Sequence, residues 1–379
     1  MARKRLRVRR KDGCVTHSAP PRRVRIDDVA REAGVSTSTV SRVLNNQPSS
    51  VRISASTANR VRHAAAALRY QPNAAARSLR TTQTRTVGVI AHNLVHPFTA
   101  ELLRAIYASC QRRGYHVLVG NAEHSGREGW ALSDLLSADR VDGILLIGDT
   151  LQRTATQDDM ERLVQTHRHV VSVGGRPSVA GEVSITVDNA TGVTLALDHL
   201  VALGHRSIAY VYEGGQLPSW EHEQRRAAYR RFVHAHGLPH GPSREVAVLD
   251  DTIEAAQDAV RQVLNVSPPP TAVFVNTDLA AILILKAALM YGFRVPGDLS
   301  VVGFDDIAFS ALCTPGLTTV YQPIEAMGRH AANALLAKIN GEEAPPVGAL
   351  GEGSEAGISF APMLVWRESC APPPPSAVV

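Results

Sequence analysis

Apolar residues recur at helical spacing in three short segments near the start of the chain. The inward stripes of these segments are Ile26, Val29, Ala30 and Ala33, then Val40, Val43 and Leu44, then Val61, Ala65 and Leu68. The first helix is favoured by acidic residues in its first turn and by Gly34 at its end, and Ser36 can cap the second helix. Two short helices joined by a glycine-containing turn predict a helix-turn-helix, followed by a third helix over 54–69.

From Thr86 onward the pattern changes to short apolar runs that end in Gly, Asn or Asp. The runs cover 86–93, 115–122, 141–148, 169–175, 207–214, 271–278 and 299–306, and amphipathic helices are predicted over 99–113, 190–203, 221–236 and 279–291. Apolar strands that alternate with helices indicate parallel sheets covered on both faces. We therefore expect ligand-binding loops at the carboxyl ends of the strands.

The net charge of +5 conceals a division along the chain. Residues 1–80 carry 18 lysines and arginines against four acidic residues, whereas the remainder carries 22 against 31. Such an asymmetry indicates a polyanionic partner for the basic segment. A basic tail without a partner is the alternative. It suits residues 1–20 but not 25–80, where the arginines are interleaved with periodic apolar residues.

The outward face of the second helix carries hydroxyl groups and one arginine instead of the usual Glu and Lys. The residues predicted to face outward are Thr37, Ser38, Thr39, Ser41 and Arg42. Short donors and acceptors of this kind contact phosphates and base edges, and arginine reaches guanine O6 and N7. The segment is therefore interpreted as a DNA recognition helix; the alternative is a hydroxyl-rich capped helix without a ligand.

Arginines of the third helix and nearby loops extend this predicted DNA surface. Arg60, Arg62 and Arg69 are available to phosphates, and Arg52 lies in the loop before the third helix. We also assign Asn45, directly after the second helix, to the DNA-binding set.

With these motifs the chain resembles the LacI/GalR family of bacterial transcription regulators. The matching motifs are VRIDDVAREAGVSTSTVSRVLN (24–45), YQPNAAARSLR (70–80), VDNATG (187–192), HLVALGHRSIAY (199–210), GFRVPGDLSVVGFDD (292–306), PGLTTVYQP (315–323) and LVWRES (364–369). The resemblance implies an N-terminal all-α helix-turn-helix DNA-binding domain plus an α/β periplasmic-binding-protein-like two-lobed effector domain. It also implies a homodimeric repressor on a palindromic double-stranded operator.

The resemblance further identifies 70–80 with the family's hinge helix, which folds in the minor groove and levers open the central base step with a leucine. Leu79 occupies that position, and Asn73 can cap the short helix. Without the resemblance, Leu79 would be interpreted as an ordinary buried leucine.

By the same resemblance a small-molecule effector lies between the lobes. The matching positions are Phe98, Arg225, Thr277, Asp278 and Asp305, and Trp220 adds an aromatic group near Arg225. Arg225 and Asp305 could equally form a structural ion pair. Gly174 and Gly175 stand where many sugar-binding members have Asp and Arg, so the expected effector is an unusual sugar, a nucleoside or another small polar metabolite.

The expected organisation has five parts. They are a disordered basic tail (1–23), the DNA-binding domain (24–71), a hinge helix and linker (72–85), the effector-binding and dimerisation domain (86–369) and a disordered tail (370–379). Within the effector domain, the N-lobe is expected over about 86–189 and 322–343, and the C-lobe over about 190–321 and 355–369. The tail after Cys370 has no leucine heptad, so a dimer is expected rather than a tetramer.

Motifs for catalysis are missing from the sequence. No GxGxxG follows an early strand, and no nucleophile elbow, P-loop or HExxH occurs. Ungrouped histidines and four scattered cysteines predict neither metal nor cofactor. We expect a cytoplasmic regulator and not an enzyme, induced by its effector, with corepression as the alternative. A sugar receptor without DNA binding is the competing class, but it would need an export signal and would leave 25–80 unused.

Overall fold

The computed structural model describes residues 24–44, 53–70, 83–91, 93–121, 140–148, 169–175, 183–214, 219–343 and 357–375. Asn45, Arg52, Asn73 and Leu79, which we predicted to bind DNA, lie outside these residues. The chain divides into two compact units, Met1–Thr82 and Gln83–Val379. Among the described residues, no helix combines the length and apolar character needed to cross a membrane.

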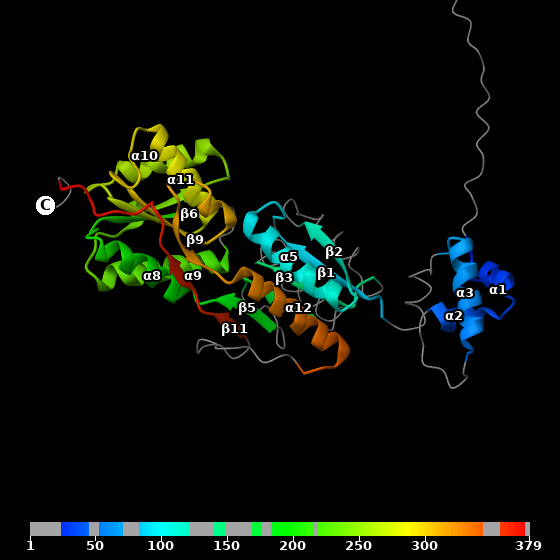
Figure 1. The fold of residues 1–379 in the computed structure, drawn as a ribbon. Helices are drawn as coiled ribbons and strands as arrows, with labels where there is room; N and C mark the ends of the chain where they lie inside the picture. Colours follow the sequence, from blue (N-terminus) through cyan, green and yellow to red (C-terminus); the bar gives the residue numbers. More distant parts are fainter. Residues whose placement is uncertain are drawn as a thin grey trace, which may run out of the picture. The chain divides into compact units, whose positions relative to one another are not determined.

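The described part of the first unit consists of three helices, α1 (Ile26–Ala33), α2 (Thr37–Leu44) and α3 (Ala55–Ala67) (Figure 1). Gly34 ends α1 in the left-handed conformation, with φ 62°, which glycine adopts without steric cost. Ser54 caps α3 by accepting a hydrogen bond from the Thr57 amide at 3.2 Å. Val29, Val40 and Val61 are fully buried at the centre of the core that the three helices share.

The prediction that Ser41 faces outward from α2 is wrong, because this residue is buried. The helix has eight residues and packs against both α1 and α3, so more than a single stripe of its surface is covered. The small Ser41 side chain lies on this covered surface, next to the core residue Val40.

The described residues of the second unit form two sheets of six strands each. The first contains β1 (Thr86–Ala91), β2 (His116–Asn121), β3 (Gly143–Ile147), β4 (Val170–Val173), β5 (Val183–Val187) and β11 (Gly357–Phe360), in the order β11-β5-β4-β3-β1-β2. The second contains β6 (Ile208–Glu213), β7 (Glu245–Val248), β8 (Ala272–Val275), β9 (Ser300–Asp305), β10 (Thr318–Tyr321) and β12 (Met363–Val365), in the order β12-β10-β9-β8-β6-β7. All pairings are parallel except that of β10 with β12.

Helices cover these sheets and define two lobes. Helices α5 (Pro97–Arg112) and α12 (Ile324–Asn340) pack on the first sheet; α8 (Asn189–Ala202), α9 (Trp220–Ala235), α10 (Ile253–Leu264) and α11 (Asp278–Met290) pack on the second, beside the short 3-10 helices η1 (Pro242–Arg244) and η2 (Ala308–Ala311). Alternate residues of β6 enter different cores. Ile208 and Tyr210 pack with α8 and α9, whereas Ala209 and Val211 pack with α10 and α11. The second sheet is therefore covered on both faces, as predicted.

The chain passes between the lobes at three described connections. They run from β5 to α8, from β10 to α12 and from β11 to β12. We predicted the whole of 355–369 in the second lobe, but β11 pairs with β5 and belongs to the first sheet. The segment crosses over between Phe360 and Met363 instead.

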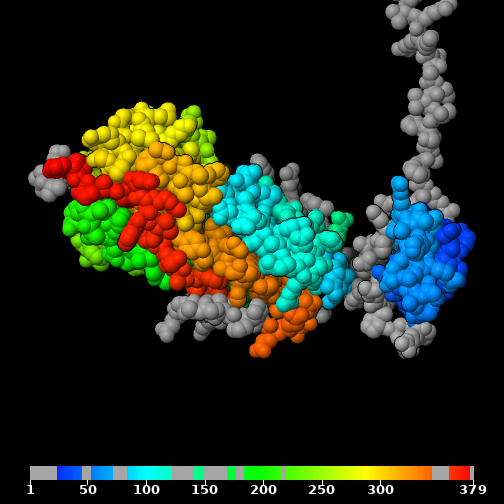
Figure 2. Space-filling view, in the orientation of Figure 1, coloured from blue at the N-terminus to red at the C-terminus, as the bar shows by residue number. Residues whose placement is uncertain are grey.

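The residues directly after β12 are ordered by contacts with the second lobe, so the prediction of a disordered tail from 370 is wrong for its first residues. The Ala371 amide donates to Ser300 Oγ at 3.1 Å, and the Ala371 carbonyl lies 2.9 Å from His205 Nε2. Figure 2 shows this C-terminal segment (red) lying across the second lobe. Buried polar groups of β9 and of the turn before β6 hold it there.

Candidate functional site

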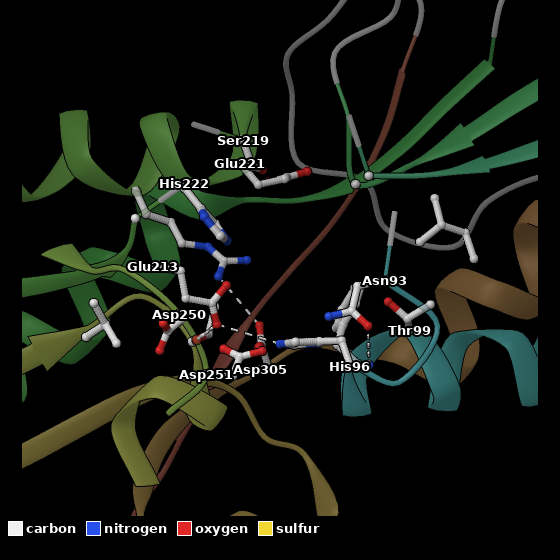
Figure 3. A pocket seen from close by; sticks show the side chains of 18 of the residues that line it. Asn93, His96, Thr99, Glu213, Ser219, Glu221, His222, Asp250, Asp251 and Asp305 are labelled. Atoms are coloured by element: carbon white, nitrogen blue, oxygen red, sulfur yellow. Dashed lines mark hydrogen bonds and ion pairs between the residues drawn. The ribbon is translucent and has the colours of Figure 1, made fainter. Parts of the chain in front are cut away.

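A cavity of about 510 Å³ lies between the two lobes, at the carboxyl ends of strands from both sheets. It is lined by Asn93, His96, Phe98, Thr99, Ile147, Gly148, Gly174, Glu213, Gly214, Ser219, Glu221, His222, Arg225, Val248, Leu249, Asp250, Asp251, Thr277, Asp305 and Gln322. Figure 3 shows side chains from both lobes converging on this space. Its size and mixed polar and apolar lining suit a small polar molecule.

An ion pair of Arg225 and Asp305 forms part of the cavity lining. Arg225 NH1 lies 3.5 Å from Asp305 Oδ1, and both side chains are 4% exposed. The guanidinium carbon also lies 3.7 Å from the centre of the Phe304 ring. Asp305 ends β9 with φ 125°, a conformation that a non-glycine residue rarely adopts, and Gln322 Nε2 donates to its Oδ1 at 2.6 Å.

Burial raises the pKa of Asp305, and Asp278 adds to this rise, although Arg225 and His96 oppose it. The strained backbone and shifted pKa at a cavity residue are typical of a functional site.

A chain of hydrogen bonds connects Arg225 with the first lobe. Its Nε donates to Asn189 Oδ1 at 2.8 Å, and Asn189 Nδ2 donates to Glu221. Glu221 Oε1 then accepts from Thr186 Oγ1 of β5 at 2.7 Å. Because Glu221 and Arg225 stand one turn apart on α9, this network ties the cavity wall of the second lobe to a strand of the first.

A second contact between the lobes joins His96, before α5, with Glu213, at the end of β6. His96 Nε2 lies 3.7 Å from Glu213 Oε1, an ion-pair distance that is too long for a hydrogen bond (Figure 3). Burial lowers the pKa of His96, but pairing with Glu213 and the nearby Asp305 and Asp251 raise it above the usual value overall. Burial likewise opposes ionisation of Glu213, yet its pairing with His96 and the nearby His222 lower its pKa to about 2.

Four of the six predicted effector residues line the cavity: Phe98, Arg225, Thr277 and Asp305. Thr277 also caps α11 and donates to Glu213 Oε1 at 2.5 Å. Trp220 is not part of the lining, because the lining residues of α9 follow one stripe at 221, 222 and 225 that position 220 does not share.

Asp278 also lies outside the cavity, because its carboxylate is turned into the second lobe. The Ile307 amide donates to its Oδ2 at 3.0 Å, Ser310 Oγ donates to the same oxygen at 2.5 Å, and Thr319 donates to Oδ1. Asp278 is fully buried, and this burial raises its pKa despite the three donors. It therefore holds the segment directly after Asp305, at Ile307 and Ser310, instead of facing a ligand.

Sequence reasoning missed several acidic residues of the lining: Glu213, Glu221, Asp250 and Asp251. Glu213 ends β6, and Asp250 follows β7 within two residues, so the rule that ligand residues stand at strand ends could have identified them. Within the described ranges, His, Cys, Asp and Glu side chains form no group of three or more that could hold a metal ion.

On the first unit, the exposed surface of α2 and α3 carries the predicted DNA-binding groups that are described. Thr37, Ser38 and Arg42 are exposed and Thr39 is half-buried. Ser36 Oγ lies 2.8 Å from Ser38 Oγ and 2.9 Å from Thr39 Oγ1, which orders the hydroxyl groups at the start of α2. Arg60, Arg62 and Arg69 are also exposed.

A small helical unit with exposed arginines, joined to a two-lobed unit around a polar cavity, defines the class of ligand-responsive DNA-binding regulators. The chain matches the model for bacterial regulatory proteins of the lacI family over residues 25–73 and that for a periplasmic binding protein-like domain over 197–370. It is 33% identical to the transcriptional repressor CytR of Escherichia coli K12 over 315 residues, which cover 83% of this chain and 89% of CytR.

It is also 34% identical over 354 residues to the transcriptional repressor PurR of Erwinia tasmaniensis, covering 92% of this chain and 97% of PurR. The crystal structure of the lac repressor dimer bound to operator and the anti-inducer ONPF is similar with a TM-score of 0.77 and 28% identity, covering 92% of this chain and 100% of that one. The chain belongs to the lacI family of bacterial regulatory proteins.

Proposed function

We propose that the protein is a homodimeric transcriptional repressor that binds a palindromic operator through α2, and that a small polar effector changes its affinity for this operator. The cavity built by both lobes carries the proposal, because a ligand there contacts two bodies whose relative position it can change. The lac repressor dimer on its operator supports the assembly. No catalytic step is assigned to the cavity, and the cytoplasm is the compartment in which such a repressor acts.

In this proposal the effector acts by differential binding. A ligand held by Arg225 and Asp305 of the second lobe and by Phe98 of the first favours the arrangement in which all three contact it. The arrangement of the lobes then changes the spacing of the two hinge segments 72–85 in the dimer, in which Leu79 would wedge into the minor groove. Coupling of this kind is commonly about 1–3 kcal/mol. We favour induction, in which the effector weakens operator binding.

The DNA-binding part of the proposal is tested on operator sequences selected from random DNA with the full chain. Arg42→Ala is expected to cost about 1–3 kcal/mol on the selected sequence and to flatten the preference at one base pair in each half-site. Arg60→Ala serves as the matched variant, because loss of a phosphate contact weakens binding to all sequences alike.

Deleting residues 1–82 separates the two functional classes. A repressor loses DNA binding but keeps its effector, whereas a receptor loses nothing. If the full chain selects no sequence, or if Arg42→Ala weakens all sequences equally, then α2 is not the recognition helix.

A further inference from the structure

A single carboxylate holds the junction at which the hinge segment 72–85 joins the first lobe, directly before β1. The Thr84 amide donates to Asp142 Oδ1 at 2.6 Å, and the Thr84 hydroxyl donates to the same oxygen at 2.9 Å. The Arg85 amide donates to Asp142 Oδ2 at 2.8 Å, and the Asp142 amide in turn donates to the Thr86 carbonyl at 2.8 Å. Both carboxylate oxygens of Asp142 therefore hold two consecutive residues of the junction, through hydrogen bonds that its charge strengthens.

Arg85 gives the junction its direction. Its φ of 55° lies in the left-handed region, which a residue other than glycine adopts at a steric cost. The Arg85 carbonyl accepts from the His116 amide of β2 at 2.9 Å, and the guanidinium carbon lies 5.3 Å from the centre of the Tyr115 ring. Contacts with β2 on one side and with Asp142 on the other thus stabilise a backbone conformation that determines where the preceding residues run.

Two buried strands connect this junction with the cavity. β1 lies between β2 and β3, and it pairs with β3 over Val87–Ala91 and Gly143–Ile147 (Figure 1). All of these residues are buried. The junction lies at the amino ends of the two strands, whereas Ile147 at the end of β3 and Asn93 just after β1 line the cavity. Paired strands of this length span about 20 Å, so a displacement of the first lobe at the cavity moves the junction with it.

We propose that Asp142 is a positioning residue for operator binding, which fixes the direction in which the hinge segment leaves the first lobe and thereby the half-site spacing that the dimer accepts. Each hinge segment of the dimer starts from its own first lobe, so the separation of the two DNA-binding units depends on these two directions. Asp142 acts through Thr84 and Arg85 and contacts neither DNA nor effector. This inference rests on the proposed operator binding and adds the residue through which the first lobe controls it.

Half-site spacing is the measurement that tests this role. The operator selected from random DNA with the full chain is synthesised with its centre shortened or lengthened by one or two base pairs, and the affinity of the full chain for each form is measured. The parent protein is expected to bind one spacing best. Asp142→Asn keeps the shape of the side chain but turns one acceptor oxygen into a donor that faces a backbone amide. In this variant the penalty for a changed spacing is expected to fall about tenfold, because the direction of the hinge segment is no longer fixed.

Two further variants locate the effect. Thr84→Val removes only the hydroxyl bond to Asp142 and is expected to relax the spacing preference to a smaller extent, which keeps the test available if Asp142→Asn does not fold. Asp298→Asn is the matched control, because the Asp298 carboxylate accepts from the Arg294 amide at 2.8 Å in a turn of the second lobe. An equal loss of affinity at every spacing, an unchanged profile in both junction variants, or the same relaxation in Asp298→Asn would overturn the proposal.

Hydrogen exchange of the full chain without DNA tests the junction by itself. Asp142→Asn is expected to speed exchange of the Thr84 and Arg85 amides by about tenfold or more, whereas Asp298→Asn leaves them protected. Unchanged protection of these amides in Asp142→Asn would overturn the proposal whatever the DNA measurements give. If the parent protein selects no operator, the proposed function fails, and the exchange rates still decide whether Asp142 holds the junction.

Discussion

The two lobes share a doubly wound architecture but contribute different chemistry to the cavity. The lining residues of the first lobe are Asn93, His96, Phe98, Thr99, Ile147, Gly148 and Gly174, none of them acidic. The second lobe supplies all five carboxylates and Arg225. In both lobes the lining residues stand at the carboxyl ends of parallel strands. The cavity wall formed by the second lobe is nevertheless charged, whereas the wall formed by the first lobe is largely uncharged.

This difference divides the work of recognition. In the proposed function, the charged and hydrogen-bonding groups of the second lobe would select the ligand, and the first lobe would cover it with an aromatic and an aliphatic side chain, Phe98 and Ile147. Hydrogen bonds hold the charged groups of the second lobe in place. Arg225 donates to Asn189, and Asp305 accepts from Gln322. The comparison can be tested by removing groups from either side.

The largest effect is expected for Arg225→Ala. The change leaves Asp305 buried without its partner, so the unfolding free energy should fall by about 3–5 kcal/mol and the response to effector should disappear. Urea unfolding and effector titration on operator-bound protein measure the two outcomes. The double variant with Asp305→Ala should recover part of the stability. A loss below about 1 kcal/mol would mean that the pair does not organise this wall.

Proton binding by His205 should cost stability in acid. Burial lowers the pKa of His205 to about 4, although the Ala371 carbonyl opposes the shift, and Thr271 and Ser300 also bond the ring. The unfolded chain binds this proton at higher pH, so the contribution of His205 to stability falls as the pH drops from about 6.5 to about 4, by up to about 3 kcal/mol.

The check on His205 is urea unfolding at several pH values combined with hydrogen exchange of both sheets. His205→Gln should be less stable at neutral pH but should lose less on acidification. Equal acid sensitivity of the variant and the parent protein would show that another group causes the effect.

A smaller effect is expected from cutting the link between the lobes at Thr186. Thr186→Val keeps the shape but removes the hydrogen bond to the Glu221 carboxylate, which should cost about 1.5–3 kcal/mol. Thr194→Val is the matched control, because Thr194 is exposed and donates to Ala190 within α8. Similar losses in the two variants, measured by urea unfolding, would argue against a special role for the link.

The smallest effect is expected for the His96–Glu213 pair, at about 0.5–1 kcal/mol. The pKa of His96 is raised in the folded protein, where Glu213, Asp305 and Asp251 face it. Its contribution is therefore fully present below about pH 6.5 and is lost as the pH rises through the folded-state pKa. A double-mutant cycle of His96→Gln and Glu213→Gln at about pH 5 and about pH 9 measures this coupling. Equal coupling at both values would contradict the assignment.

Most of the framework follows from the sequence because its strands are continuous apolar runs. All seven predicted strands and all four predicted helices of the second unit are present, with ends shifted by a few residues. The strands that we did not predict are β5, β7, β10, β11 and β12. They have three to five residues, no more than several strands that we did predict, and β11 and β12 gain their structure from partners far away in the chain.

The site was harder to predict at the turn from β8 into α11. Thr277 and Asp278 are adjacent, and both follow a buried strand, yet Thr277 lines the cavity whereas Asp278 faces the interior. Sequence alone does not reveal which side of such a turn a carboxylate faces. The decision depends on donors from Ser310 and Thr319, more than 30 residues away.

The crossing segment 357–371 has a consequence for biosynthesis. Strand β11 completes the first sheet, β12 completes the second, and Ala371 satisfies His205 beneath it. Neither lobe can therefore finish folding while this segment is still inside the ribosome, whereas the local contacts of α1, α2 and α3 form long before. The nascent protein is expected to expose an assembled DNA-binding unit before its lobes are complete, so a stalled ribosome would display the DNA-binding surface without the cavity between the lobes.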